Sequence, residues 1–170
     1  QALKAAAFLE GDFTLRSGRK SRYYLDKYLF ETQPALLRAL GERFARHVTP
    51  AIDRVAGAEL GAIALAAATS LETGKPFVIV RNAKKAGYGT GKLIEGRLER
   101  GERVLLVEDI ATSGGQAVEA LQTLRDAGAV VEEVVVVIDR QEGAREAIEA
   151  AGYRFTALFT TTDLGVAPPQ

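Results

Sequence analysis

Two short, almost purely apolar runs constrain the fold of this chain more than any other feature. They are Val104–Val107 and Val134–Ile138, and a segment long enough for a helix separates them. A strand with one face in water alternates apolar and polar residues, whereas a strand covered on both faces is apolar throughout. From Ile52 onward, helix-length segments or one long loop separate the candidate strands. The sequence therefore predicts an α/β fold in which helices flank a central, mostly parallel sheet.

The individual elements follow from apolar spacing, turn residues and helix-ending glycines. Helices are expected over Ala2–Leu9, from Pro34 onward, and over Leu60–Thr73, Ala117–Ala127 and Ala144–Ala151. Strands are expected over Phe13–Arg16, Arg22–Leu29, Ile52–Ala56, Pro76–Arg81, Arg103–Asp109, Val130–Asp139 and Phe155–Thr160. The segment Asn82–Gly96 contains four glycines and no apolar periodicity, so a long loop is expected there.

The 170 residues suit one domain with a sizeable hydrophobic core. The segment before Pro34 does not fit the strand–helix alternation of the rest. We therefore expect a single domain over residues 1–170, in which residues 1–33 form a small N-terminal hood and residues 34–170 form the α/β core.

Several kinds of protein are excluded by composition. The chain has no Cys, which removes disulfides, thiolate metal sites and a cysteine nucleophile, and its single His, His47, argues against a histidine metal site or triad. The longest apolar stretch, Ala62–Ala68, is far too short to cross a bilayer, and Gln1–Glu10 has no signal-peptide pattern. A formal net charge of zero argues against a generic nucleic-acid binder. We expect a cytoplasmic protein without membrane or nucleic-acid partners.

The neutral total hides two strongly basic segments. Arg16–Lys27 has five basic residues and one acid, Arg81–Lys92 has four basic residues and no acid, and the rest of the chain is acidic. Such segments are often solvated loops or faces. Because both also contain Gly and Tyr, a site for a small polyanion is the alternative.

The most informative motif runs over Val104–Gly115. An apolar strand ends in Glu108 and Asp109, and a Thr-Ser-Gly-Gly loop then leads into a helix. Ligands of open α/β sheets bind at the carboxyl ends of the strands, and a helix N-terminus attracts phosphate. Adjacent strand residues point to opposite faces, so the two acids cannot act in the same way. The alternative is that the acids and hydroxyls only cap the helix.

With these residues in view, Val104–Gly115 resembles the phosphoribosyl diphosphate (PRPP) motif of type I phosphoribosyltransferases. The loop lacks the glycine patterns of triphosphate and dinucleotide sites. Three further segments are similar to those of the orotate phosphoribosyltransferase family: Gly11–Tyr24 to its N-terminal signature, Arg81–Gly96 to its mobile catalytic loop, and Asp139–Gly143 to its distal strand end. They occur in the family's order and cover most of the chain.

The resemblance implies a role for each matching residue. The PRPP-binding set is Arg16, Arg81, Lys84, Lys85, Tyr88, Glu108, Asp109, Ile110, Ala111, Thr112, Ser113, Gly114, Gly115 and Gln116. Within it, the Thr-Ser-Gly-Gly loop would hold the 5′-phosphate and the two acids would face the ribose hydroxyls. The orotate-binding set is Tyr24, Leu25, Thr112 and Arg140, whose guanidinium suits a planar carboxylate. The catalytic set is Lys84, Lys85, Asp109 and Arg81.

The sequence also departs from the family pattern. The segment Gly57–Gly61 lacks the Lys that some members carry there. The basic loop is one residue longer than the common spacing, which leaves open whether Lys84 or Lys85 is the catalytic lysine. Tyr88 replaces a frequent His, and Glu108 replaces a frequent Asp.

The resemblance implies an enzyme that transfers ribose 5-phosphate from PRPP to N1 of orotate, giving orotidine 5′-monophosphate and diphosphate for pyrimidine biosynthesis. Positive charge grows on the sugar and negative charge on diphosphate, so cations, Mg²⁺ and a water-excluding lid suit the residue types. Mg²⁺ would be held mainly by PRPP and waters, with no protein ligand assigned. A homodimer whose lid reaches the partner's site is also implied.

Two other functions remain open. One is a phosphoribosyltransferase for another base, which would keep Glu108–Gly115 but not the Arg19–Leu25 signature together with Arg140. The other is a PRPP-sensing transcription regulator on the same fold. Such a regulator needs a DNA-binding element, and about ten residues before Gly11 are too few for a helix-turn-helix.

Overall fold

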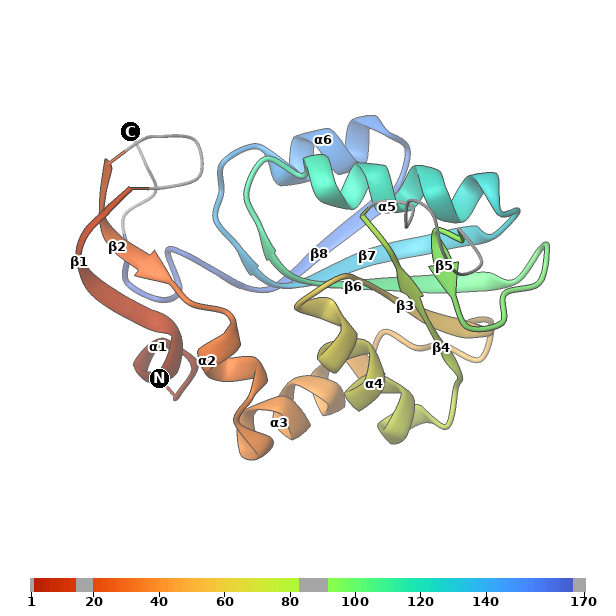
Figure 1. The fold of residues 1–170 in the computed structure, drawn as a ribbon, viewed down its shortest axis with the longest axis horizontal. Helices are drawn as coiled ribbons and strands as arrows, with labels where there is room; N and C mark the ends of the chain where they lie inside the picture. The colour runs from red at the N-terminus through yellow and green to blue at the C-terminus, as the bar shows by residue number, and fades with distance from the viewer. Residues whose placement is uncertain (1, 15–19, 83–91, 167–170) are drawn as a thin grey trace.

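A six-stranded sheet forms the centre of the protein, which we describe from a computed structural model over residues 2–14, 20–82 and 92–166 (Figure 1). Its strands are β3 (Arg54–Ala58), β4 (Phe77–Val80), β5 (Ile94–Glu95), β6 (Arg103–Ala111), β7 (Val130–Asp139) and β8 (Arg154–Thr160). Their order is β5-β4-β3-β6-β7-β8, and every neighbouring pair is parallel except β4 and β5. The predicted α/β fold with a mostly parallel sheet is confirmed.

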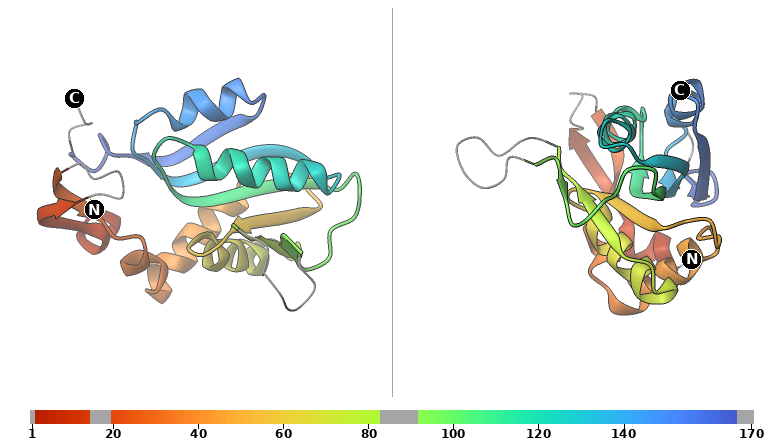
Figure 2. Two further views of the ribbon diagram at one scale, coloured as in Figure 1. Left: turned by 45° about the horizontal axis from the view of Figure 1, so that its top comes forward. Right: turned by 90° about the vertical axis from the view of Figure 1, so that its right-hand side faces the viewer.

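Helices cover both faces of this sheet (Figures 1 and 2). The helices on one face are α3 (Pro34–Ala45) and α4 (Ala62–Thr73), and those on the other are α5 (Gly115–Asp126) and α6 (Ala144–Ala150). In β6, Leu105 and Val107 pack in the core beneath α3 and α4, whereas Val104 and Leu106 pack in the core beneath α5 and α6. Both sides of the strand are buried, which explains why the sequence is apolar without alternation.

The strand order reverses between β3 and β6. From β3 the chain passes through α4 to β4 on one side, and from β6 it passes through α5 to β7 on the other. The loops that leave the carboxyl ends of β3 and β6 therefore diverge, and this divergence is where open α/β sheets bind ligands.

The N-terminal segment forms a separate two-stranded sheet at one end of the molecule, near the last described residues (Figures 1 and 2). It contains α1 (Ala2–Ala7), the antiparallel strands β1 (Phe8–Thr14) and β2 (Lys20–Leu25), and α2 (Tyr28–Glu31). Leu3, Leu25 and Phe30 are buried in the same core cluster as Leu40 and Phe44 of α3. The hairpin thus shares a core with the α/β region, and the boundary after residue 33 stays a prediction.

Two predicted elements near the N-terminus were wrong at their ends. The helix expected over Ala2–Leu9 ends at Ala7, because β1 begins at Phe8. The Phe8 ring lies 5.7 Å from Tyr23 of β2, and this cross-strand contact outweighs the local helix preference. The strand expected over Arg22–Leu29 ends at Leu25, since Tyr28 and Leu29 belong to α2.

The loop expected over Asn82–Gly96 contains a short strand at its end. Ile94–Glu95 forms β5, with Ile94 opposite Val80 of β4. Two residues are too few to show strand periodicity, so only the pairing with β4 reveals the element. Residues 83–91 of that loop lie outside the described residues.

None of the described helices is long and apolar enough to span a membrane.

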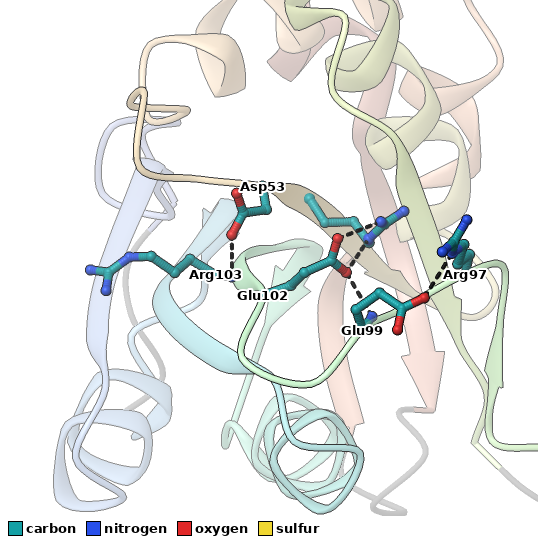
Figure 3. A network of polar contacts seen from close by, with 6 residues as sticks. Asp53, Arg97, Glu99, Glu102 and Arg103 are labelled. Atoms are coloured by element: carbon teal, nitrogen blue, oxygen red, sulfur yellow. Dashed lines mark hydrogen bonds and ion pairs between the residues drawn. The ribbon is translucent and has the colours of Figure 1, made fainter.

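Glu102 lies at the centre of a polar network beside the start of β6 (Figure 3). Its carboxylate accepts hydrogen bonds from Arg54 Nη2 at 2.6 Å and Nε at 2.8 Å, and from the Glu99 backbone N–H at 2.8 Å. The hydrogen bonds from Arg54 hold the pKa of Glu102 below its ordinary value.

Replacing Glu102 by Gln is expected to lower the free energy of unfolding at pH 7 by about 1 kcal/mol. A lowered pKa in the folded state stabilises above the unfolded pKa and ceases to do so as pH falls through the folded value. The difference from the wild type should therefore shrink below about pH 4. Denaturant unfolding between pH 3 and pH 7 measures it, with the exposed Glu99→Gln as the matched control. A difference independent of pH would contradict the assignment.

Candidate active site

A cavity of about 970 Å³ opens at the carboxyl end of β6. It is lined by Thr14, Tyr24, Glu108, Ile110, Ala111, Thr112, Ser113, Gly114, Gly115, Gln116, Ala117, Arg140 and Glu142. These residues come from the hairpin, from β6 and the loop after it, and from the segment after β7. The fold thus brings three distant segments together at the edge where a ligand site is expected.

The loop after β6 reaches α5 through a glycine in the left-handed conformation. Gly114 is the N-cap of α5 with φ +80°. A Cβ at this position would lie 3.1 Å from both Cα and the carbonyl oxygen of Ala144 and 3.3 Å from Ala147 Cβ, so α6 packs directly on the loop. The loop therefore presents backbone and hydroxyl groups at the positive end of a twelve-residue helix, as the predicted phosphate site requires.

Glu108 faces this cavity from the side of β6 that packs on α5 and α6. One carboxylate oxygen, Oε1, accepts the Asp109 backbone N–H at 3.2 Å. The other, Oε2, is buried and has no hydrogen-bond partner among the described residues. Burial, reinforced by the charge of Asp109, raises the pKa of Glu108 well above its ordinary value. A buried acceptor without a partner is costly, so Oε2 suits a ligand that brings a hydroxyl donor.

Asp109 points to the opposite face of β6 and is not among the residues that line the cavity. Its Oδ2 lies 2.7 Å from Lys27 Nζ. A Cβ on Gly61 would come within 2.0 Å of the same oxygen, so the carboxylate occupies the space that this glycine leaves open. The expectation that adjacent acids face different surroundings is confirmed.

The residues that the resemblance assigns to the base lie on two sides of the cavity. Tyr24 lines it from β2, and Arg140 lines it from the end of β7. Arg140 Nε donates to Glu142 Oε1 at 2.8 Å, and its guanidinium lies 5.5 Å from the centre of the Tyr23 ring. Leu25 lies elsewhere: it is buried in the hydrophobic core and is not a lining residue.

Arg81 does not line this cavity either. It lines a smaller cavity of about 60 Å³ beside α5, and its Nη1 lies 3.6 Å from Glu95 Oε1. Gln116 lines both cavities and so connects the two regions. Arg16, Lys84, Lys85 and Tyr88 lie outside the described residues.

Sequence reasoning missed several residues around the site. Thr14, Ala117 and Glu142 line the cavity, and Lys27 and Glu31 lie beside Asp109. Lys27 and Glu142 belong to segments that the charge pattern and the resemblance had marked, but nothing local singles them out. Nothing in the sequence marks Glu31 as a site residue, because it comes close to Asp109 only in the folded chain.

The described residues include no group of three or more His, Cys, Asp or Glu side chains that could hold a metal ion.

Comparison with known proteins relates the chain to phosphoribosyltransferases by both sequence and structure. The family model for a phosphoribosyl transferase domain matches residues 30–155. The chain is 51% identical over 154 residues to the orotate phosphoribosyltransferase of Methanocella arvoryzae, covering 91% of this chain and 87% of that protein. The crystal structure of Mycobacterium tuberculosis orotate phosphoribosyltransferase in complex with Fe(III) dicitrate superposes with a TM-score of 0.84 at 34% identity, covering 97% and 95% of the two chains. The same mycobacterial protein in complex with PRPP superposes with a TM-score of 0.77 at 34% identity, covering 96% and 94%.

Proposed function

The chain belongs to the orotate phosphoribosyltransferase family, and from this premise we propose which of its residues carry each part of the reaction. It transfers ribose 5-phosphate from PRPP to N1 of orotate, giving orotidine 5′-monophosphate and diphosphate in pyrimidine biosynthesis. The observation that carries the assignment of residues is the cavity at the end of β6, in which a helix N-terminus faces a buried arginine.

The phosphate and ribose of PRPP are assigned to the end of β6 and the loop that follows it. Thr112, Ser113, Gly114 and Gly115 surround the 5′-phosphate with hydroxyl and backbone donors, and the N-terminus of α5 adds positive partial charge. Ile110, Ala111 and Gln116 line the same region. Glu108 Oε2, buried and unpartnered, accepts a ribose hydroxyl. Asp109 approaches the ribose from the side of β3 and Gly61.

Orotate is assigned to the opposite part of the cavity. Arg140 pairs with its carboxylate, which is geometrically suited to the planar guanidinium. Tyr24 and Thr112 border the ring, while Leu25, the next residue of β2, is buried in the core. Glu142, which holds Arg140 Nε, fixes the direction of the guanidinium.

The leaving diphosphate is assigned to the basic segments. Arg16, Arg81, Lys84, Lys85 and Tyr88 would surround it as negative charge grows on its oxygens, while the sugar becomes positive. The segment 81–96 would act as the lid that excludes water. Support for these roles, for a homodimer that shares its lids and for a cytoplasmic location comes from the resemblance to the family.

Mg²⁺ is the proposed cofactor, and the donor set of this chain fits an ion that arrives with its substrate. Mg²⁺ prefers six oxygen ligands and usually keeps several waters. Diphosphate and ribose oxygens of PRPP would supply most such ligands, and the ion would neutralise charge on the leaving group. The buried acceptor of Glu108 orients the ribose that carries those oxygens.

The proposed activity is tested by mixing the protein with orotate, PRPP and Mg²⁺ and following the loss of orotate absorbance. Stoichiometric formation of orotidine 5′-monophosphate and diphosphate is expected. No turnover with orotate, but turnover with a purine or with uracil, would assign the protein to another base. No turnover with any base, alongside PRPP-dependent DNA binding, would assign it to regulation.

Arg140→Lys is expected to raise the KM for orotate by about tenfold to a hundredfold, because a lysine cannot form the two parallel hydrogen bonds of a guanidinium. The KM for PRPP should change by less than about threefold, since the phosphate loop is intact. Steady-state kinetics with each substrate varied in turn measures the two constants. Arg145→Lys, on the exposed surface of α6, is the control. An equal rise in both constants would show that Arg140 acts on the whole site instead.

A further inference from the structure

Three ionisable side chains meet beside the carboxyl end of β6, on the face of the strand that carries Asp109. Lys27 Nζ lies 2.7 Å from Asp109 Oδ2. A Cβ on Gly61 would lie 2.0 Å from Asp109 Oδ2 and 2.8 Å from Glu31 Oε1. Both carboxyl groups therefore occupy the open space above Gly61, at the start of α4, and the ammonium group of Lys27 joins them there.

The carboxyl groups in this region outnumber the positive charge. Glu31 is 4% exposed, and its Oε1 has no hydrogen-bond partner among the described residues. Burial and the charge of Asp109 raise the pKa of Glu31 to about 7, while Lys27 opposes the shift. Burial and the charge of Asp109 also raise the pKa of Glu108, and Lys27 again opposes the shift. The ammonium group of Lys27 thus favours the ionised forms of Glu31 and Glu108, against the effect of their burial.

Lys27 itself is held in place by the helix that follows it. It is the N-cap of α2, and its carbonyl oxygen accepts the Glu31 backbone N–H at 3.0 Å, so the two side chains lie about one helical turn apart. Phe30, between them, is fully buried in the core. The Tyr28 backbone N–H donates to Asp26 Oδ1 at 3.0 Å, which fixes the first turn. The ammonium group therefore approaches Asp109 from an anchored position.

We propose that Lys27 is a positioning residue of the active site, which holds the Asp109 carboxylate at Gly61, where that carboxylate accepts ribose hydroxyls of PRPP. The inference rests on the proposed function, which assigns Asp109 to the ribose. Without Lys27, the carboxyl groups of Asp109, Glu31 and Glu108 lie close together, and no other ammonium group of the described residues is paired with Asp109. The Asp109 carboxylate then turns away from Gly61, and the ribose hydroxyls lose an acceptor.

The test compares Lys27→Met with Lys27→Arg, which restores the charge. The control is Lys75→Met, because Lys75 follows the C-terminal end of α4, a helix about 18 Å long that begins at Gly61. Lys27→Met is expected to raise the KM for PRPP about tenfold or more, and to weaken ribose 5-phosphate binding equally. Diphosphate affinity and the KM for orotate should stay within about threefold. Lys27→Arg should recover most of the loss.

The pH profile separates this role from a structural one. The ionisable groups near Asp109 among the described residues are Lys27 and Glu31 at α2 and the adjacent Glu108 on β6, with Asp26 and Tyr28 next to Lys27. Lys27 opposes the raised pKa of Glu31 and of Glu108, so its loss lets these two carboxyl groups keep their protons to higher pH. The penalty of Lys27→Met on the KM for PRPP should therefore be larger at pH 6 than at pH 8.5. A merely structural defect lowers the melting temperature without this dependence.

Several outcomes would overturn the inference. An unchanged KM for PRPP would do so, as would a penalty that is independent of pH. Weaker diphosphate binding with normal ribose 5-phosphate binding would make Lys27 a direct diphosphate ligand instead. If Lys27→Met fails to fold, Lys27→Gln and Lys27→Arg are compared by the same measurements. The proposed function fails separately, when the wild-type protein forms no orotidine 5′-monophosphate.

Discussion

The Gly114→Ala enzyme is expected to bind PRPP and ribose 5-phosphate at least about a hundredfold more weakly than the wild type. The left-handed backbone at φ +80° costs a side-chain-bearing residue about 1–2 kcal/mol. The added methyl group would also lie 3.1 Å from the Ala144 backbone, which belongs to a packed helix and has no room to move aside. The phosphate loop must shift instead, and the donors around the 5′-phosphate shift with it.

Calorimetric titration with ribose 5-phosphate measures this loss directly, and the KM for PRPP measures it during turnover. Gly152→Ala is the matched control, because Gly152 also has a left-handed backbone, with φ +90°, but its Cβ would meet no atom within 4 Å. That variant reports strain without crowding at the phosphate loop. Wild-type affinity in Gly114→Ala would show that the loop after β6 does not bind the phosphate.

A second large effect is expected in the basic loop. Lys84→Ala and Lys85→Ala should differ greatly, with one of them lowering kcat by about a hundredfold to a thousandfold and the other by less than about tenfold. One ammonium group at the leaving diphosphate oxygen is enough to stabilise the charge that develops there, so we expect only one of the two lysines to take this role. Rates at saturating PRPP and orotate identify the residue. Full activity in both variants would refute the lid assignment.

The same variants test whether the lid acts across a dimer. The inactive lysine variant is mixed with Gly114→Ala, whose lid is intact and whose phosphate loop is not. In a mixed dimer with exchanged lids, one site combines a sound loop with a sound lid, and random pairing would restore about a quarter of the wild-type rate. No recovery after subunit exchange would show that each lid serves its own site.

The sequence predicted the α/β core well because the physical cause of each strand is local. The runs Val104–Val107 and Val134–Ile138 are apolar throughout, and no other simple arrangement buries them on both faces. Pro34 and Gly74 marked real helix ends for the same reason: their backbone preferences belong to the residues themselves. The strands that contain Phe8 and Ile94 were not predicted, because each forms only by pairing with a strand elsewhere in the chain.

The same distinction between local and long-range causes applies to the candidate site. The sequence by itself determined the place of the proposed phosphate loop, since Thr112–Gly115 follows a buried strand and leads into a helix, and it determined that Glu108 and Asp109 leave the strand in opposite directions. Only the tertiary structure decided what each acid meets: an open cavity for Glu108, and Lys27 with Glu31 above Gly61 for Asp109. Only the tertiary structure, likewise, shows that Leu25 is buried in the core and that Glu142 accepts a hydrogen bond from Arg140. The physical reason is that strand periodicity fixes the direction of a side chain, whereas its partners depend on how helices and hairpin pack on the sheet.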